Sequence, residues 1–153
     1  MSSKRTRLEK FNQLVEPENL ALFLRIMVSI PVFRSLVKRV EMPDLVRRLD
    51  SRSPERRPLG EGDHRRAELA SKYADFLLVK CLRQKNPCLL RSLILFHIFR
   101  GKGLDARIHF GVKRDGADLA GHAWLSLGGQ CRLEPEDPLA SYAEMYSYPH
   151  AKS

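Results

Sequence analysis

The stretch NPCLLRSLILF, residues 86–96, predicts a buried helix with a cysteine in its first turn. Asn86 is a favourable N-cap and Pro87 suits the first helical position, so Cys88 takes the second. The unpaired N–H groups and the positive end of the helix dipole favour a thiolate there. The stretch therefore predicts a nucleophilic cysteine. The alternative is an inert core thiol, since most cysteines in small soluble domains are of that kind.

A histidine and a carboxylate follow at positions that fit this cysteine. Alternating apolar residues over 106–112 predict a half-buried strand, and residues 122–127 predict a second strand that begins at His122. Turn signals at 115–116 and 128–129 separate these strands and a third one predicted over 130–134. A helix-borne cysteine, a strand-borne histidine and a later carboxylate are typical of thiol proteases, whose catalytic residues meet in space.

The part of the chain before Asn86 predicts helices. Apolar residues from Glu16 to Ile30 predict one helix that Pro31 interrupts, and a second helix and a short third piece follow up to Leu49. A Pro, Gly and charge-rich connection over 51–63 then precedes a helix predicted over 63–82, and residues 140–146 predict a short helical patch. We therefore expect an α+β fold divided into a helical region and linker (1–62) and a chemical domain (63–153).

Composition excludes several classes of protein. The chain has 153 residues, and its net charge of +9 comes from scattered basic residues without interleaved aromatic residues, so nucleic-acid binding is not expected. Its three cysteines lack the spacing of a zinc site or a disulfide framework, so we expect reduced thiols and no metal. Residues 1–10 do not resemble a secretory signal, so we expect a cytoplasmic location. Charges and a proline break the stretch from Leu20 to Val37, so it predicts two packed helices and not a membrane span. Membrane association is not expected.

The motifs together resemble one family. The order of a helix-borne cysteine, a strand-borne histidine and a carboxylate beyond the next turn resembles that of papain-like and transglutaminase-like thiol enzymes. The motifs that carry the resemblance are residues 88–93, 100–107, 111–112 and 122–125, with Gly128-Gly129 after them. More closely, they resemble the lasso peptide biosynthesis B proteins, which are transglutaminase-like leader peptidases of the microcin J25 type, in their stand-alone peptidase form. The resemblance covers roughly residues 64–147. It implies a transglutaminase-like or papain-like core, with a central helix packed on a small antiparallel sheet.

The resemblance also implies roles and partners. Cys88 would be the nucleophile, His122 the base, and Glu134 the third member of the triad, with Asp137 as the alternative because the family usually has an aspartate there. The Cys88 N–H would hold the oxyanion together with one unidentified donor. The implied partners are a lasso precursor peptide with its leader, a separate winged-helix leader-recognition protein and an asparagine-synthetase-like cyclase. Peptide hydrolysis would need no cofactor.

Three further residues are candidates for the substrate cleft. Trp124 shares a strand face with His122 and would shield the catalytic pair or serve as a core aromatic residue. His109 would line the cleft or lie on the surface, and Arg91 would support the thiolate or a substrate carboxylate, or belong to a solvated helix face. His97, Cys81 and Cys131 are expected to be structural or inert.

The expected function is a cysteine peptidase that removes the leader from a lasso precursor. Two alternatives stay open. The first is an acyl transferase that passes the acyl group to an amine, as transglutaminases do. The second is a non-catalytic peptide-binding subunit. For the helices before residue 51, docking of a partner, proximity to a membrane, and a lid packed on the core are all open.

Overall fold

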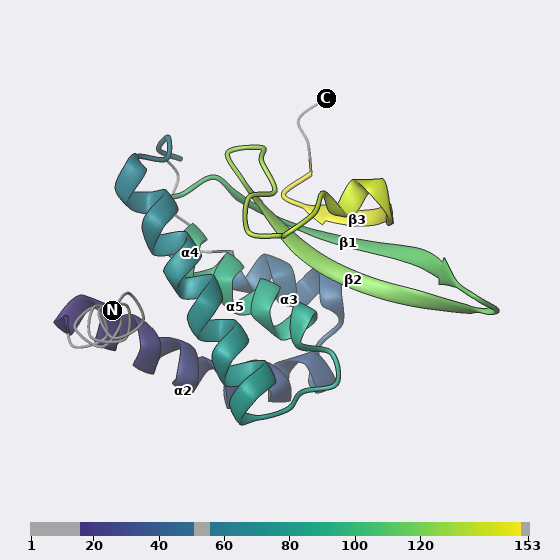
Figure 1. The fold of residues 1–153 in the computed structure, drawn as a ribbon, viewed down its shortest axis with the longest axis horizontal. Coiled ribbons are helices and arrows are strands. Elements are labelled where there is room, and N and C mark those ends of the chain that lie inside the picture. Colours follow the sequence, from purple (N-terminus) through teal and green to yellow (C-terminus); the bar gives the residue numbers. More distant parts are fainter. Residues whose placement is uncertain (1–15, 51–55, 151–153) are drawn as a thin grey trace, which may run out of the picture.

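The central element of the fold is helix α5, Pro87–Gly101, which is apolar on nearly all sides. In this computed structural model, which describes residues 16–50 and 56–150, three helices pack against α5. They are α2 (Pro17–Arg39), α3 (Met42–Leu49) and α4 (Glu61–Asp75), and a π-helical segment, η1 (Phe76–Cys81), follows α4. The antiparallel strands β1 (Ala106–Asp115) and β2 (Asp118–Leu127) also pack against α5 (Figure 1). Because α5 has neighbours on so many sides, it has no polar face.

The sheet has three antiparallel strands in the order β2-β1-β3, where β3 is Ala143–Tyr148. The pairing of β1 with β2 sets Gly111 opposite His122 and His109 opposite Trp124. The hairpin formed by β1 and β2 extends well beyond the helices (Figure 1). Within the described residues, four helices and this small sheet confirm the predicted α+β class with an N-terminal helical part.

The prediction of a third strand over 130–134 is wrong. In the described chain those residues form turns and only one isolated bridge, between Leu127 and Gln130. The third strand is β3, where a helical patch was predicted, and a short 3-10 helix, η2 (Pro138–Ala140), precedes it. The free edge of β1 explains the difference, since pairing with it satisfies backbone groups that a short isolated helix would leave unsatisfied.

Pro31 does not interrupt the first helix, contrary to the prediction. Helix α2 continues through it, and its buried residues Ile26, Ile30 and Phe33 lie on both sides of the proline. Packing of this one face on the core outweighs the hydrogen bond that proline removes. The buried residues of α2 and α3 belong to the same core cluster as those of α5. The division at residue 62 stays a prediction, and residues 1–15, 51–55 and 151–153 lie outside the described chain.

Asp50 joins three elements of the fold. Its carboxylate accepts hydrogen bonds from Nε and Nη2 of Arg100 at 2.6 and 2.7 Å and from the Tyr148 hydroxyl at 3.2 Å. Arg56 lies 3.1 Å away and adds a second positive charge. Burial alone would raise the pKa of Asp50, but the hydrogen bonds and charge of Arg100 and the charge of Arg56 outweigh it, so the pKa lies below its usual value. Asp50 therefore fixes α3 to the end of α5 and to β3.

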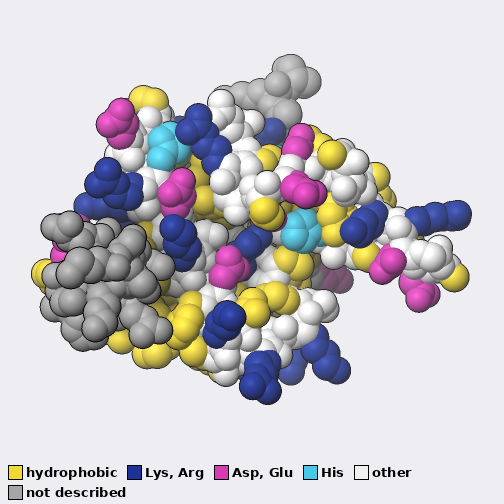
Figure 2. Space-filling model, viewed as in Figure 1, with side chains coloured by type: hydrophobic (Ala, Val, Ile, Leu, Met, Phe, Trp, Pro, Cys, Tyr) yellow, Lys and Arg dark blue, Asp and Glu magenta, His cyan; other side chains and the backbone are white. Residues whose placement is uncertain are grey.

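Helix α2 is the one helix of the described chain that is long and apolar enough to cross a membrane by length and composition. The mean hydropathy of its most apolar window is 1.9, and 17% of that window is buried. One such helix is weak evidence for a membrane span, because the core helix of a soluble protein meets the same criterion. Figure 2 shows hydrophobic side chains along the lower edge of the molecule, where α2 runs in Figure 1.

Candidate active site

Cys88 occupies the helix start that the sequence predicts. Asn86 is the N-cap residue of α5 and Pro87 is its first residue, so Cys88 is the second. The thiol is half-buried, and the first turn of the helix contains no acidic residue. A backbone N–H at this position has no partner within the helix and points in the direction that favours an anion. Cys88 therefore lies beside unpaired backbone N–H groups at the positive end of the α5 dipole.

Cys88 and His122 line the same cleft, although they come from different elements. The cleft lies between the start of α5 and the β1–β2 hairpin and has a volume of about 550 Å³. Its other walls are largely apolar and include Met42, Leu89 and Phe110. The fold thus places on one cleft two residues that are 34 positions apart in the sequence.

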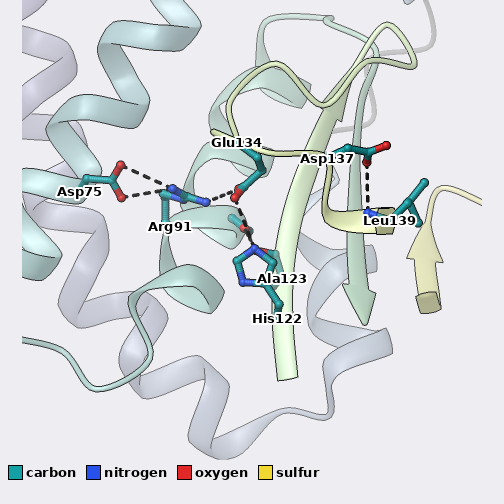
Figure 3. A network of polar contacts seen from close by, with 8 residues as sticks. Asp75, Arg91, His122, Ala123, Glu134, Asp137 and Leu139 are labelled. Atoms are coloured by element: carbon teal, nitrogen blue, oxygen red, sulfur yellow. Dashed lines mark hydrogen bonds and ion pairs between the residues drawn. The ribbon is translucent and has the colours of Figure 1, made fainter. Parts of the chain in front are cut away.

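Glu134 holds the imidazole of His122 from the side of Nε2. The Nε2 atom lies 3.3 Å from Oε2 of Glu134 (Figure 3). Because an ionised carboxylate only accepts hydrogen bonds, Nε2 carries the proton in this pair. In neutral His122 the Nδ1 lone pair is then available as a base. This arrangement orients the ring and favours the imidazolium that forms after proton transfer.

A second carboxylate and an arginine support Glu134. The Glu134 side chain is only 8% exposed, and its Oε1 accepts a hydrogen bond from Nη2 of Arg91. Nη1 of Arg91 lies 3.3 Å from Oδ1 of Asp75 (Figure 3). A buried carboxylate needs such a partner, because leaving its charge unpaired in the interior is costly. Arg91 therefore belongs to neither a solvated helix face nor the cleft lining, and it contacts the carboxylate beside His122.

Asp137, the alternative third member, lies elsewhere. Its Oδ1 accepts a hydrogen bond of 3.1 Å from the backbone N–H of Leu139 and caps η2 (Figure 3). In the described chain the carboxylate that contacts His122 is that of Glu134. The geometry thus selects Glu134 for the orienting position, and its catalytic role stays a prediction.

Aromatic rings surround His122. Trp124 is fully buried and stacks on His122 and on His109, with ring centroids 5.8 and 5.5 Å apart. The ring of Tyr142 lies 4.9 Å from that of His122. Trp124 and His109 are not among the residues that line the cleft. They brace the histidine from the side of the sheet.

His109 has polar partners of its own. Its Nδ1 lies 2.5 Å from Oε1 of Glu144 on β3, and its Nε2 lies 2.8 Å from the Ser126 hydroxyl. Both ring nitrogens are therefore engaged, and the ring is held parallel to Trp124 with an interplanar angle of 7°. The contacts position His109 as support for the aromatic stack.

Gly111 makes room for this arrangement. A Cβ atom at Gly111 would lie 2.8 Å from Cη2 of Trp124 and 2.9 Å from the carbonyl oxygen of Ala143. Both distances are too short for real carbon contacts, so the ring of Trp124 and strand β3 can approach only a glycine. The sequence analysis did not assign Gly111, Tyr142 or Asp75 to the site. For Gly111 a signal was available, because a glycine inside a predicted strand often marks the close approach of another group.

Cys81 and His97 are placed away from this chemistry, whereas Cys131 lies near Trp124 and Glu134 but does not line the cleft. Cys81 is exposed. Burial, followed by the charge of Asp137, raises the pKa of the Cys131 thiol. His97 lies 3.0 Å from the Leu49 carbonyl oxygen through Nδ1 and packs on Phe33. Within residues 16–50 and 56–150, no group of three or more His, Cys, Asp or Glu residues is placed to hold a metal.

Comparison with known proteins gives one match. The model of the family described as the transglutaminase-like superfamily matches residues 27–147, most of the chain and nearly all of the described part. No curated protein matches. No solved structure matches. The superfamily generally contains cysteine-protease-like enzymes, and the cleft residues Cys88 and His122 lie inside the matched residues, as does Glu134 beside His122. The chain therefore belongs to the transglutaminase-like superfamily.

Proposed function

We propose that the protein is a cytoplasmic cysteine peptidase that removes the leader from a lasso precursor peptide. The observation that carries the proposal is that Cys88 and His122 line one cleft while Glu134 contacts Nε2 of the same histidine. Membership of the transglutaminase-like superfamily is consistent with a cysteine peptidase or an acyltransferase. The finer assignment is supported by the resemblance of the motifs around Cys88 and His122 to leader peptidases.

The residues of the cleft account for the steps of peptide hydrolysis. Nδ1 of His122 takes the proton from Sγ of Cys88, and the thiolate attacks the carbonyl carbon of the scissile peptide bond. The oxyanion of the tetrahedral intermediate accepts a hydrogen bond from the backbone N–H of Cys88 at the start of α5. The imidazolium then protonates the leaving amine, and a thioester remains on Cys88.

Water completes the reaction. Neutral His122 removes a proton from a water molecule, which attacks the thioester carbonyl carbon, and the protonated histidine returns its proton to Sγ as the acid product leaves. Glu134 stabilises each imidazolium stage because its carboxylate faces Nε2, and Arg91 keeps that carboxylate in place. No step requires a cofactor.

The proposed partners follow the same resemblance. A separate leader-recognition protein would bring the precursor to the cleft, and an asparagine-synthetase-like cyclase would close the ring of the released peptide. The apolar walls of the cleft, which include Leu89 and Phe110, suit an extended peptide with uncharged side chains beside the scissile bond.

The test is cleavage of a lasso precursor in the presence of its recognition protein, followed by mass spectrometry. The wild-type protein is expected to release the leader with a free carboxylate, whereas Cys88→Ala should release none. Cys81→Ala is the matched control, because Cys81 is exposed on η1 and does not line the cleft. Release of the leader by folded Cys88→Ala at the wild-type rate would falsify the peptidase proposal.

Acyl transfer is the second candidate, because the superfamily match supports both reactions. The same thioester on Cys88 would then react with an amine in place of water. Adding a primary amine to the assay separates the two reactions, since transfer gives a new amide of the expected mass and hydrolysis gives only the acid. A folded protein that binds the precursor but forms neither product would instead favour a non-catalytic peptide-binding subunit.

A further inference from the structure

Helix α2 presents an apolar face to solvent that the core does not use. Its buried side, Ile26, Ile30 and Phe33, packs inward. On the other side five large apolar side chains are 43–63% exposed: Leu20, Leu24, Met27, Val28 and Val32. Leu20, Leu24, Val28 and Val32 follow at intervals of four residues and Met27 lies beside Val28, so all five fall on one side of the helix over about three turns. An exposed apolar face of this length marks a surface that contacts something else.

Basic residues border this face on both edges. At 100° per residue, Arg25 and Arg34 fall on opposite sides of the apolar strip, and both are exposed. Lys38 and Arg39 add two positive charges in the last turn of α2. The one acidic residue of the helix, Glu18, is paired with Arg66 of α4 at 2.8 Å. Apart from Glu18, which pairs with Arg66, all charged residues of α2 are therefore basic.

A cluster of cations lies along one edge of the same face. Arg25, Arg66 and Lys102 line a hollow of about 270 Å³ beside α2, together with Glu18. Partial burial, followed by the charges of Arg66 and Arg25, lowers the pKa of Lys102, while the charges of Asp63 and Glu18 act in the opposite direction. An anionic group here would relieve the repulsion among the three cations.

We propose that α2 docks the protein onto an anionic membrane surface, with its apolar strip in the interface and the bordering cations on phosphate headgroups. An aliphatic strip with basic residues along its edges is the pattern of a helix that lies in the plane of the bilayer. The long side chains of Arg25 and Arg34 can reach headgroups while the strip between them is buried. Because Ile26, Ile30 and Phe33 are fixed in the core, the helix lies on the membrane and does not cross it.

A protein partner fits the same face less well. Protein interfaces are centred on aromatic and arginine anchors that fill pockets. The strip on α2 contains only aliphatic and methionine side chains. This docking does not depend on the proposed peptidase activity, and it selects proximity to a membrane among the roles that the sequence leaves open for the N-terminal helices.

The test is co-sedimentation of the full chain with large unilamellar vesicles. We expect binding to mixed phosphatidylcholine and phosphatidylglycerol vesicles, little binding to phosphatidylcholine alone, and weaker binding as salt rises. The variant carrying Leu24→Glu and Val28→Glu should lose at least about tenfold in affinity, because both residues lie in the strip. Arg25→Gln and Lys102→Gln should each cost about fivefold.

Leu139→Glu is the matched control, because Leu139 is 56% exposed on η2 and lies far along the chain from α2. This variant should bind vesicles as the wild type does. All variants are checked for folding by circular dichroism and for peptidase activity in solution, which should be unchanged. The proposal is overturned if the folded wild type ignores anionic vesicles at low salt, or if the double variant binds as well as Leu139→Glu. Loss of a concentration-dependent dimer in the double variant, without vesicle binding by the wild type, would assign the face to a second copy instead.

Discussion

Glu134 is the residue whose role depends most on its environment. It is buried, contacts Nε2 of His122 and is held by Arg91, whereas Asp137 caps a short helix. The two acids lie three positions apart in the sequence and have different chemical surroundings. The role of a carboxylate near a predicted site is therefore set by which neighbour fixes its side chain.

Glu134→Gln is expected to lower kcat by roughly a hundredfold with little change in KM. The amide oxygen can still accept the hydrogen bond from Nε2, but it carries no negative charge to stabilise the imidazolium of His122. Substrate binding should change little because Glu134 does not line the cleft. Arg91 keeps its contact with Asp75, so the variant should fold, and circular dichroism checks this. The measurement is steady-state cleavage of the precursor.

Asp137→Asn is the matched control for that experiment. An asparagine oxygen can still accept the hydrogen bond from the Leu139 N–H, so activity should stay within about twofold of the wild type. A loss in Asp137→Asn equal to that in Glu134→Gln would contradict the assignment.

Much of the candidate site could be predicted at the residue scale. Asn86 and Pro87 indicate a helix start, and the alternation after residue 121 indicates a strand, so Cys88 and His122 could be chosen from local patterns. Tyr142 and Asp75 could not be chosen. Their contacts with His122 and Arg91 depend on how the C-terminal strand and helix α4 pack, which no local pattern encodes.

At the scale of elements, the helices were easier to predict than the strands. The apolar face that runs through α2 and the capping signals of α5 are local. Strand β3 was missed because its residues are stabilised by the edge of β1, more than thirty positions earlier in the chain. Its pattern alone was compatible with a helix. Pro31 was misjudged for the opposite reason, because distant packing overrode a local breaker.

Gly111→Ala tests the close approach of β1, Trp124 and β3. The new Cβ would meet the Trp124 ring and the Ala143 carbonyl at under 3 Å, so either the ring or strand β3 must shift. We expect a loss of about 1–3 kcal/mol in the free energy of unfolding, measured by urea denaturation, and a lower kcat because Trp124 braces His122.

Gly121→Ala is the comparison for stability, because a Cβ at Gly121 meets nothing within 4 Å. It should change the free energy of unfolding by less than about 1 kcal/mol. Equal destabilisation by the two variants would show that the effect of Gly111→Ala is a general cost of replacing a strand glycine.

At the scale of the whole molecule, Asp50 connects the N-terminal helices to the part of the chain that carries the site. Arg100 is only 4% exposed, and its guanidinium pairs with the carboxylate of Asp50. Asp50→Asn leaves this buried guanidinium without its charged partner. We expect a loss of about 3 kcal/mol in the free energy of unfolding by urea. Asp44→Asn is the control, because the Asp44 to Arg47 pair is exposed on α3 and should contribute less than about 1 kcal/mol.

Acid should also weaken the fold through two aspartates. Hydrogen bonds from Arg57 and from the Gly60 N–H lower the pKa of Asp63 to about 2, and the pKa of Asp50 also lies below its usual value. A lowered folded-state pKa gives stability that is present above the unfolded value near 4 and is lost as pH falls through the folded value. Urea midpoints should therefore change little between pH 7 and pH 5 and fall between about pH 4 and pH 2.

The doubly substituted Asp50→Asn, Asp63→Asn protein should lose part of that acid dependence while being less stable at neutral pH. An unchanged slope between pH 4 and pH 2 in this variant would assign acid sensitivity to other carboxylates.

The account rests on a thiolate at Cys88 that His122 maintains, and alkylation of the native protein measures this directly. Iodoacetamide at about pH 6, followed by peptide mass mapping, should modify Cys88 at least about tenfold faster than exposed Cys81, with Cys131 slowest because burial raises the pKa of its thiol. In His122→Ala the rate at Cys88 should fall to that at Cys81 or below. Equal or slower modification of Cys88 in the wild type, or no change in His122→Ala, would contradict the account.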